Sequence, residues 1–261
     1  MSTADGATRL SVNLNKVALV RNSRDTTIPG VVAAAETAID AGARGITVHP
    51  RPDMRHIRPG DVEDLAILLS ETVYQDIEFN IEGNPYAGAE PSGFPGFMAL
   101  VKSSAPHQCT LVPDDPGQLT SDHGWRLGGE SDRLKTVVEE LQDHGIRVSL
   151  FMDPVGEEIE RAAALGVDRI ELYTGPYAEA WGKNDFEEVL AKFVDAAKLA
   201  HSLSLGINAG HDLDLNNLGT FCSRVPHVAE VSIGHALISD AIWMGLETAV
   251  RKYRQILDEC A

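Results

Sequence analysis

Hydrophobic residues along the chain follow two alternating patterns. Short runs of Val, Ile and Leu, such as Gly45–His49 and Arg147–Met152, have the length of buried strands, and the longer stretches between them repeat apolar residues at helical spacing. The clearest helical stretch begins at Asn184, which Glu187 follows three residues later as in a capping box. The chain therefore alternates strands with helices.

This pattern predicts eight strands, each followed by a helix. The strands are expected at Leu10–Lys16, Gly45–His49, Ile77–Glu82, Cys109–Val112, Arg147–Met152, Arg169–Tyr173, Leu205–Ala209 and Glu230–Ile233. Besides the helix from Asn184, helices are expected at Pro29–Ala41, Val62–Tyr74, Gly96–Ser103, Glu130–His144, Gly156–Leu165, Leu215–Cys222 and in one long terminal segment ending near Leu257. Eight repeats predict an α/β fold, a closed (β/α)8 TIM barrel forming a single catalytic domain over residues 1–261, with room for extra helices. An open doubly wound sheet is the alternative, although no strand is followed by G-x-G-x-x-G.

Composition and charge narrow the class of ligand. The 261 residues suffice for one barrel, and the net charge of −17 disfavours nucleic acid and anionic membranes as partners. Residues 1–60 nevertheless hold eight Lys and Arg against five Asp and Glu, so this segment is +3 and the remainder is −20. A local basic cluster on an acidic chain favours a small anionic ligand, and a scatter of unrelated surface cations is the alternative.

Cysteine usage and hydropathy exclude further classes. Cys109, Cys222 and Cys260 are too few and too scattered for a disulfide framework or a zinc site. The first ten residues lack the pattern of a signal peptide, and no apolar stretch reaches the roughly 18 residues of a membrane span. We therefore expect a cytoplasmic protein.

Polar residues gather where the strands are expected to end. They are Asn13, Asn15 and Lys16 on the first strand, His49 and Arg51 on the second, Asn80 and Glu82 on the third, Glu171 and Thr174 on the sixth, Asn208 and His211 on the seventh, and Gly234 and His235 on the eighth. Any one of them alone is more often a structural His, an ion-paired Glu or a turn Asn. Six strand ends with such groups predict a shared active site, because barrel enzymes place their chemistry at this end.

The last two strands end in the same pattern, a polar residue followed by x-Gly-His. It reads N-A-G-H up to His211 and S-I-G-H up to His235. Glycine lets the backbone approach a ligand closely, and a helix that begins after Gly234 would direct free N–H groups toward an anion. These features predict a phosphate site.

Cations near the first two strands offer a second anion site. Arg24 and Arg51 can each contact a phosphate through two N–H groups, and Lys16 can act as a point charge. Two phosphate sites in one barrel mouth indicate two phosphorylated substrates, or one substrate with a phosphate at each end.

Between the two anion sites lie His49, Glu82 and His211. Histidine titrates near neutral pH, and the pKa of a glutamate in a barrel mouth shifts toward neutrality when water is excluded. This set of side chains predicts repeated proton transfers. A divalent metal held by the same His and Glu residues is the alternative, which the basic surroundings disfavour.

At these residues the sequence resembles the pyridoxine 5′-phosphate synthase family, from Val12 to about Leu246. The shared stretches are, in order, VNLNKVALVRNSR, GITVHPR, RHI, NIE, LVP, VSLFMD, IELYTGPYA, NAGH and IGHA. The resemblance implies a condensation of 1-deoxy-D-xylulose 5-phosphate with 3-amino-2-oxopropyl phosphate to pyridoxine 5′-phosphate, phosphate and water. It implies neither a metal nor an organic cofactor.

The resemblance also implies a role for each matching residue. His49 and Glu82 would be the general bases, His211 the general acid, and Glu171 would support charge in the transition state. Asn13 would contact the aminoketone phosphate, and Gly234 and His235 would form the phosphate site described above. The deoxyxylulose phosphate or its derivatives would be held by Asn15, Lys16, Arg24, Arg51, His56 and Thr120. The family assembles as an octamer and closes a loop after the fourth strand, here Pro113–Gly129, so we expect a homo-oligomer with a lid.

Three regions depart from the family's pattern. The first motif usually reads N-x-D-H, whereas this chain ends it with Asn15 and Lys16. Asp212 replaces a glycine whose backbone would approach the substrate, and it adds negative charge near a phosphate. The Gly/Pro-rich segment Gly83–Pro95 is several residues longer than usual, which would alter the rim of the pocket.

Two other functions stay open. A different phosphosugar enzyme of this fold, an isomerase or an aldolase, would explain the phosphate sites but not the extended motifs, and an imine-forming aldolase would need a lysine that strands three to eight lack. The other alternative is a catalytically dead phosphate-binding barrel, against which the intact His49, Glu82 and His211 argue. Small phosphorylated molecules are the expected partners in each case.

Overall fold

Eight parallel strands form one closed barrel in chain order. The computed structural model describes residues 7–24, 26–115, 117–128 and 131–261. The strands are β1 (Arg9–Asn13), β2 (Gly45–Val48), β3 (Glu78–Gly83), β4 (Gln108–Leu111), β5 (Arg147–Met152), β6 (Arg169–Tyr173), β7 (Gly206–Gly210) and β8 (Val228–Ile233). Because β1 pairs with β8 as well as with β2, the prediction of a (β/α)8 TIM barrel is confirmed and the open sheet is excluded.

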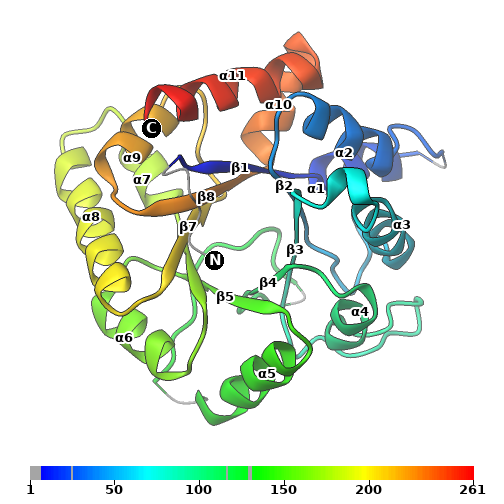
Figure 1. Ribbon diagram of the computed structural model, residues 1–261, viewed down its shortest axis with the longest axis horizontal. Helices are drawn as coiled ribbons and strands as arrows, with labels where there is room; N and C mark the ends of the chain where they lie inside the picture. The colour runs from blue at the N-terminus through cyan, green and yellow to red at the C-terminus, as the bar shows by residue number, and fades with distance from the viewer. Residues whose placement is uncertain (1–6, 25, 116, 129–130) are drawn as a thin grey trace.

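The helices surround this ring of strands (Figure 1). They are α1 (Asn15–Asn22), α2 (Val31–Asp40), α3 (Pro59–Leu69), α4 (Phe97–Ser104), α5 (Ser131–Asp143), α6 (Gly156–Ala164), α7 (Gly175–Ala180), α8 (Phe186–Ser202), α9 (Leu218–Arg224), α10 (His235–Met244) and α11 (Leu246–Glu259), with a 3-10 turn η1 (Thr72–Tyr74). Within the described residues, no helix combines the length and the hydropathy that a membrane span requires.

The strands bury side chains on both faces, and one of these faces is polar. Leu10 and Val12 of β1 have no exposed surface, while Ser11 between them shares a 2.7 Å hydrogen bond with Thr47 of β2. Thr110 of β4 likewise donates to Asn80 Oδ1 of β3 at 3.1 Å. Because side chains alternate along a strand, the polar set lies inside the barrel, where buried polar groups need partners.

The predicted end of the first strand and the predicted start of the helix at Asn184 were both wrong. Asn15 and Lys16 begin α1 instead of ending β1, so the polar groups of this motif stand on a helix N-terminus. Helix α8 begins at Phe186 after Asp185, without a side-chain cap, and Glu187 pairs with Arg224 at 3.0 Å. The capping box expected from Asn184 is therefore absent.

The long terminal helix is in fact two helices. Gly245, at φ +83°, separates α10 from α11 in a conformation that other residues adopt only with strain. The short helix α7 was also not predicted. The start of the expected helix at Glu130, like Gly129 of the expected lid, lies outside the described residues.

The long segment Gly83–Pro95 packs beside the loop that follows β4. An antiparallel bridge joins Ala89 to Pro95, and the ring of Tyr86 meets the ring of Trp125 edge-on at 6.1 Å. The guanidinium of Arg133 lies 3.8 Å from the centre of the Tyr86 ring. Tyr86 of this segment thus contacts Trp125 of the expected lid.

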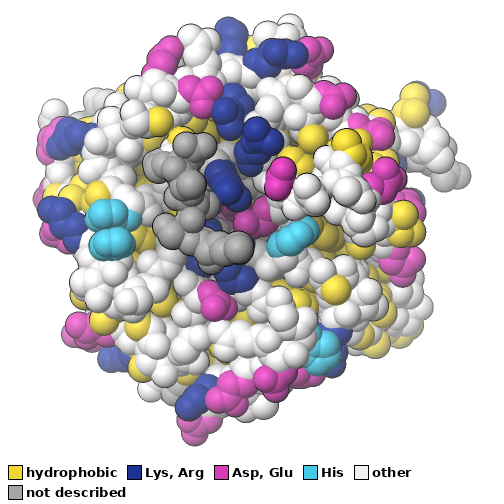
Figure 2. All heavy atoms as spheres, viewed as in Figure 1, with side chains coloured by type: hydrophobic (Ala, Val, Ile, Leu, Met, Phe, Trp, Pro, Cys, Tyr) yellow, Lys and Arg dark blue, Asp and Glu magenta, His cyan; other side chains and the backbone are white. Residues whose placement is uncertain are grey.

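Charged side chains of both signs are spread over the surface. In Figure 2 several Lys and Arg side chains lie near the centre of the visible face with a few Asp and Glu side chains beside them, and further side chains of both signs lie toward the rim.

Candidate active site

The carboxyl ends of the strands open into a cavity of about 340 Å³. Thirteen of the fourteen predicted site residues line it: Asn13, Asn15, Lys16, His49, Arg51, His56, Glu82, Thr120, Glu171, His211, Asp212, Gly234 and His235. The remaining one, Arg24, is exposed beyond the end of α1 and is not among the lining residues. Residues from distant parts of the sequence therefore meet in one place.

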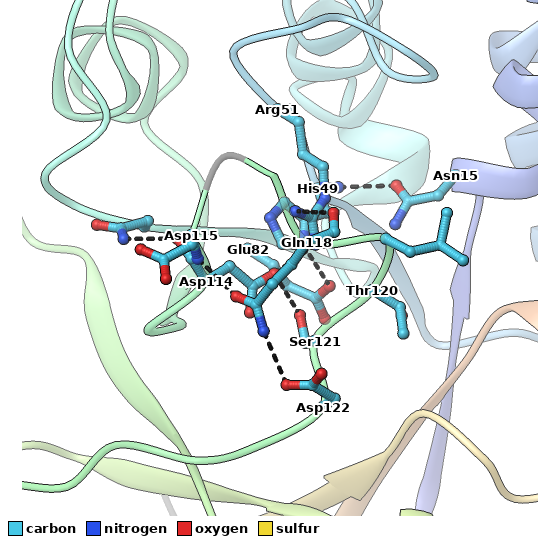
Figure 3. Close-up of polar contacts among 12 residues, drawn as sticks. Asn15, His49, Arg51, Glu82, Asp114, Asp115, Gln118, Thr120, Ser121 and Asp122 are labelled. Atoms are coloured by element: carbon cyan, nitrogen blue, oxygen red, sulfur yellow. Dashed lines mark hydrogen bonds and ion pairs between the residues drawn. The ribbon is translucent and has the colours of Figure 1, made fainter.

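A chain of hydrogen bonds at the start of α1 positions the two predicted bases. The backbone N–H of His49 donates to Asn15 Oδ1 at 2.8 Å (Figure 3), and the backbone N–H of Asn15 donates to Asn13 Oδ1 at 3.0 Å. The amide of Asn13 donates to Glu82 Oε2 at 3.2 Å, and this oxygen lies 3.9 Å from His49 Nδ1. Asn15, one of the departures from the family pattern, thus holds the backbone of His49.

The phosphate site expected at the end of β8 would lie at the start of α10. Helix α10, ten residues long, begins at His235 directly after Gly234. A Cβ on Gly234 would lie 3.1 Å from Asn13 Cβ, so a side chain here would require Asn13 to shift by a few tenths of an ångström. The free N–H groups at the start of α10 therefore lie beside the cavity, together with Asn13.

Two arginines hold the loop after β4 over the opposite side of the cavity. Arg51 forms a buried ion pair with Asp114, whose Oδ2 also accepts the hydroxyl of Ser121 at 2.7 Å (Figure 3). Arg55 donates to the carbonyl oxygen of Gln118 at 2.9 Å. The predicted phosphate ligand Arg51 is thus tied to the expected lid.

The imidazole of His211 bridges the lid and β7. Its Nε2 lies 2.6 Å from Thr120 Oγ1, and its Nδ1 lies 2.7 Å from Asp212 Oδ2. Thr120 therefore meets His211 directly.

The sequence profile of the PdxJ family, described as pyridoxal phosphate biosynthesis protein PdxJ, matches residues 10–259. The chain belongs to this family. The pyridoxine 5′-phosphate synthase of Xanthomonas oryzae pv. oryzae (strain PXO99A) is 54% identical over 250 residues, which are 96% of each chain. The pyridoxine 5′-phosphate synthase of Xylella fastidiosa (strain 9a5c) is 54% identical over 252 residues, 96% of this chain and 95% of the other.

Solved structures of low identity share the barrel of this chain. KGPDC from Streptococcus mutans aligns with a TM-score of 0.63 at 13% identity, over 97% of this chain and 98% of the other. Phosphoribosyl anthranilate isomerase from Thermotoga maritima aligns with a TM-score of 0.59 at 12% identity, over 97% and 99%. At these identities the likeness concerns the fold alone.

Burial shifts the pKa values of the two predicted bases in opposite directions. Burial, followed by the charge of Arg51, holds the pKa of His49 well below its usual value of 6.5. Burial, followed by the neighbouring Glu171, raises the pKa of Glu82 well above 4.5. At neutral pH the imidazole of His49 is therefore neutral, whereas the shift at Glu82 favours the protonated form of its carboxyl.

Two further groups in the cavity are also shifted by burial. The pKa of His56 is lowered to about 3, by burial and then by Arg51, and its Nδ1 accepts the backbone N–H of Ile57 at 2.9 Å. Burial raises the pKa of Glu171 to about 7. His56 is thus a neutral hydrogen-bonding group, whereas Glu171 changes charge near neutral pH.

Sequence reasoning missed the residues that connect the cavity to its lid. Arg55, Leu119 and Ser121 line the cavity, and Asp114 is the buried partner of Arg51. Only Arg55 had a sequence signal, since it precedes His56 in the RHI motif. Within the described residues, no group of three or more His, Cys, Asp or Glu side chains is arranged to hold a metal ion.

Proposed function

We propose that the chain is a pyridoxine 5′-phosphate synthase. It condenses 1-deoxy-D-xylulose 5-phosphate with 3-amino-2-oxopropyl phosphate and releases pyridoxine 5′-phosphate, phosphate and water. Relatives at 54% identity over 96% of the chain carry this name. The gathering of acid–base and phosphate-binding side chains in one cavity supports the same activity.

The observation that carries the proposal is the contrast between His49 and Glu82. A neutral His49 can accept a proton from a substrate carbon at once. A protonated Glu82 can first donate its proton to the hydroxyl group that leaves as water when the imine forms. The carboxylate that remains can then accept a proton from carbon, so one residue serves two successive steps. His211 acts as a general acid, and Glu171 supports positive charge on the intermediate.

The two phosphates are held by two neighbouring groups of residues in the cavity. One is bound by the start of α10 at Gly234 and His235, together with Asn13. The other is bound by cationic and polar side chains under the lid: Asn15, Lys16, Arg51, His56 and Thr120. Closure of the lid excludes water from the reactive intermediates. The predicted contact of Arg24 with phosphate stays a prediction, because this residue lies outside the cavity lining.

We further propose that the protein is a homo-oligomer, an octamer as the family resemblance implies. Trp243 and Ile242 on α10 support assembly, since their side chains are 88% and 70% exposed in the single chain. Adjacent exposed apolar side chains of this size are typical of a surface covered by a partner.

The test is an assay with both phosphorylated substrates in the presence of EDTA. Pyridoxine 5′-phosphate and released phosphate are expected to form at equal rates. Glu82→Gln is expected to bind both substrates but to lose nearly all turnover, whereas Glu160→Gln, an exposed residue of α6, keeps it. Binding of phosphate compounds without product would refute the synthase and favour another phosphosugar enzyme or an inactive barrel.

A further inference from the structure

The imidazole of His211 is held at both nitrogens. Asp212 Oδ2 lies 2.7 Å from Nδ1, and Thr120 Oγ1 lies 2.6 Å from Nε2. The ring of Tyr173 meets the imidazole nearly edge-on, with 5.8 Å between ring centres. Three side chains therefore fix the orientation of this ring.

The backbone at this point is held as firmly as the side chain. His211 has φ +98°, a conformation that residues other than glycine adopt only with strain, and its N–H donates to the carbonyl oxygen of Ser232 at 3.2 Å. The N–H of Asp212 donates to Thr174 Oγ1 at 3.2 Å, and its carbonyl oxygen accepts the amide of Asn217 at 3.3 Å. Thr174 and Asn217 are both buried, so the carboxylate of Asp212 starts from a fixed position.

Hydrogen-bond chemistry decides which nitrogen of His211 carries the proton. An ionised carboxylate can only accept, so the Nδ1 beside Asp212 must be the protonated nitrogen. In the neutral ring, Nε2 is then left with a lone pair that accepts the hydroxyl of Thr120, and in the charged ring Nε2 donates. The nitrogen that exchanges protons is therefore the one that lies beside Thr120.

We propose that Asp212 is a positioning residue, whose carboxylate fixes the tautomer and orientation of His211 so that Nε2 transfers the proton. The proposal rests on the role of His211 as general acid in the proposed function. It differs from the role expected from the family resemblance, in which a glycine at this place brings its backbone to the substrate. In this chain the substitution of that glycine supplies a carboxylate to the imidazole.

The substitution Asp212→Asn tests this role. The carboxamide has nearly the shape of the carboxylate, but its NH2 group can donate to Nδ1 and thereby favours the wrong tautomer. We expect kcat to fall roughly 10- to 100-fold with little change in either KM. The loss is smaller than the roughly 10⁴-fold loss seen for a buried carboxylate, because the side chains of His211 and Asp212 are 31% and 38% exposed.

An exposed carboxylate away from the cavity and its lid supplies the control. Asp258 on α11 pairs with Arg254 at 2.8 Å and does not line the cavity. Asp258→Asn makes the same change of charge and is expected to keep the kcat of the wild type. A normal kcat in Asp212→Asn, or a change confined to KM, would overturn the proposal and make Asp212 a substrate contact.

A measurement without turnover separates this proposal from the proposed function. The ¹⁵N resonances of the His211 imidazole in the wild-type protein, assigned by their loss in His211→Gln, report which nitrogen is protonated in the neutral ring. We expect the proton on Nδ1, and a proton on Nε2 would refute the positioning role. A wild-type protein that makes no pyridoxine phosphate but holds the proton on Nδ1 would refute the synthase and leave the positioning role intact.

Discussion

Glu171 shows how burial couples activity to stability at a single residue. Its pKa of about 7 in the folded chain exceeds the ordinary 4.5, and the first cause is burial; Thr110 donates to its Oε2 at 3.4 Å. The folded state therefore binds this proton more tightly than the unfolded state. The stabilisation is complete below about pH 4.5 and is lost as the pH rises through about 7.

The variant Glu171→Gln is expected to be more stable than the wild type at pH 8 and equally stable at pH 4.5. The amide resembles the protonated carboxyl, so the variant avoids the cost of a buried charge, which is at most about 3 kcal/mol. Thermal unfolding at the two pH values measures the difference. Turnover is expected to fall, because the charge at this position is lost.

Glu160→Gln is the control for this experiment, since Glu160 is exposed on α6. It should change the unfolding temperature equally little at both pH values. A Glu171→Gln variant that is less stable than the wild type at pH 8 would contradict the assigned direction of the pKa shift.

Some residues of the site could be recognised from the sequence and others could not. Glu82, Glu171 and Asn208 were recognisable because they interrupt hydrophobic strands at positions where burial demands a reason. Asp114 was not recognisable, because its partner Arg51 is 63 positions away and only the path of the loop brings them together. The position of Arg24 was not predictable either, because it follows helix α1, and the sequence pattern had predicted a strand up to Lys16 and no helix after it.

At the scale of elements, the loop after β4 depends on one carboxylate. Asp114 is buried, and its Oδ2 takes both the guanidinium of Arg51 and the hydroxyl of Ser121. The carbonyl oxygen of Gln118 adds contacts to Arg51 and Arg55. Loss of the carboxylate would leave Arg51 buried beside an uncharged partner.

Asp114→Asn is therefore expected to loosen the loop and to destabilise the chain. Removal of one partner of a buried ion pair costs about 3–5 kcal/mol in comparable cases. Hydrogen exchange of residues 117–128 should speed up, and kcat/KM should fall by about tenfold as Arg51 loses its orientation. Exchange measured by mass spectrometry, together with steady-state kinetics, checks both effects.

Asp115→Asn is the matched control, because Asp115 is the exposed neighbour of Asp114 in the same loop. It should leave exchange and turnover close to those of the wild type. Equal exchange in Asp114→Asn and the wild type would mean that the ion pair does not hold the lid.

Element ends were harder to predict than elements. Strands β5 and β6 begin and end where the hydrophobic pattern places them. The terminal helix was predicted as one because Gly245 is compatible with an amphipathic pattern, and only its φ of +83° breaks the helix. Asn15 and Lys16 continue the sequence of a strand but begin a helix, since Asn13 Oδ1 accepts the N–H of Asn15.

The whole molecule was the most predictable level. Eight strand–helix repeats leave few arrangements other than a closed barrel, and closure brings eight strand ends to one mouth. The gathering of the residues predicted at strand ends follows from this topology, whereas His56 and Thr120 lie on loops and were expected only from the family resemblance. The surface proposed to pack against other copies does not follow from it, because the exposure of a side chain depends on which helices lie outermost.

Trp243 gives the proposed assembly a direct test. Its side chain is 88% exposed on α10, next to Ile242 at 70%, and burial of a tryptophan in an interface contributes strongly to association.

An octamer has a mass of about 225 kDa, eight times the 28.1 kDa of one chain. Light scattering after size exclusion is expected to give this mass for the wild type and for Trp243→Phe. Trp243→Glu is expected to give smaller species, because a carboxylate in an apolar interface is left unpaired. An unchanged mass in Trp243→Glu would place the interface elsewhere, and a monomeric wild type would refute the assembly.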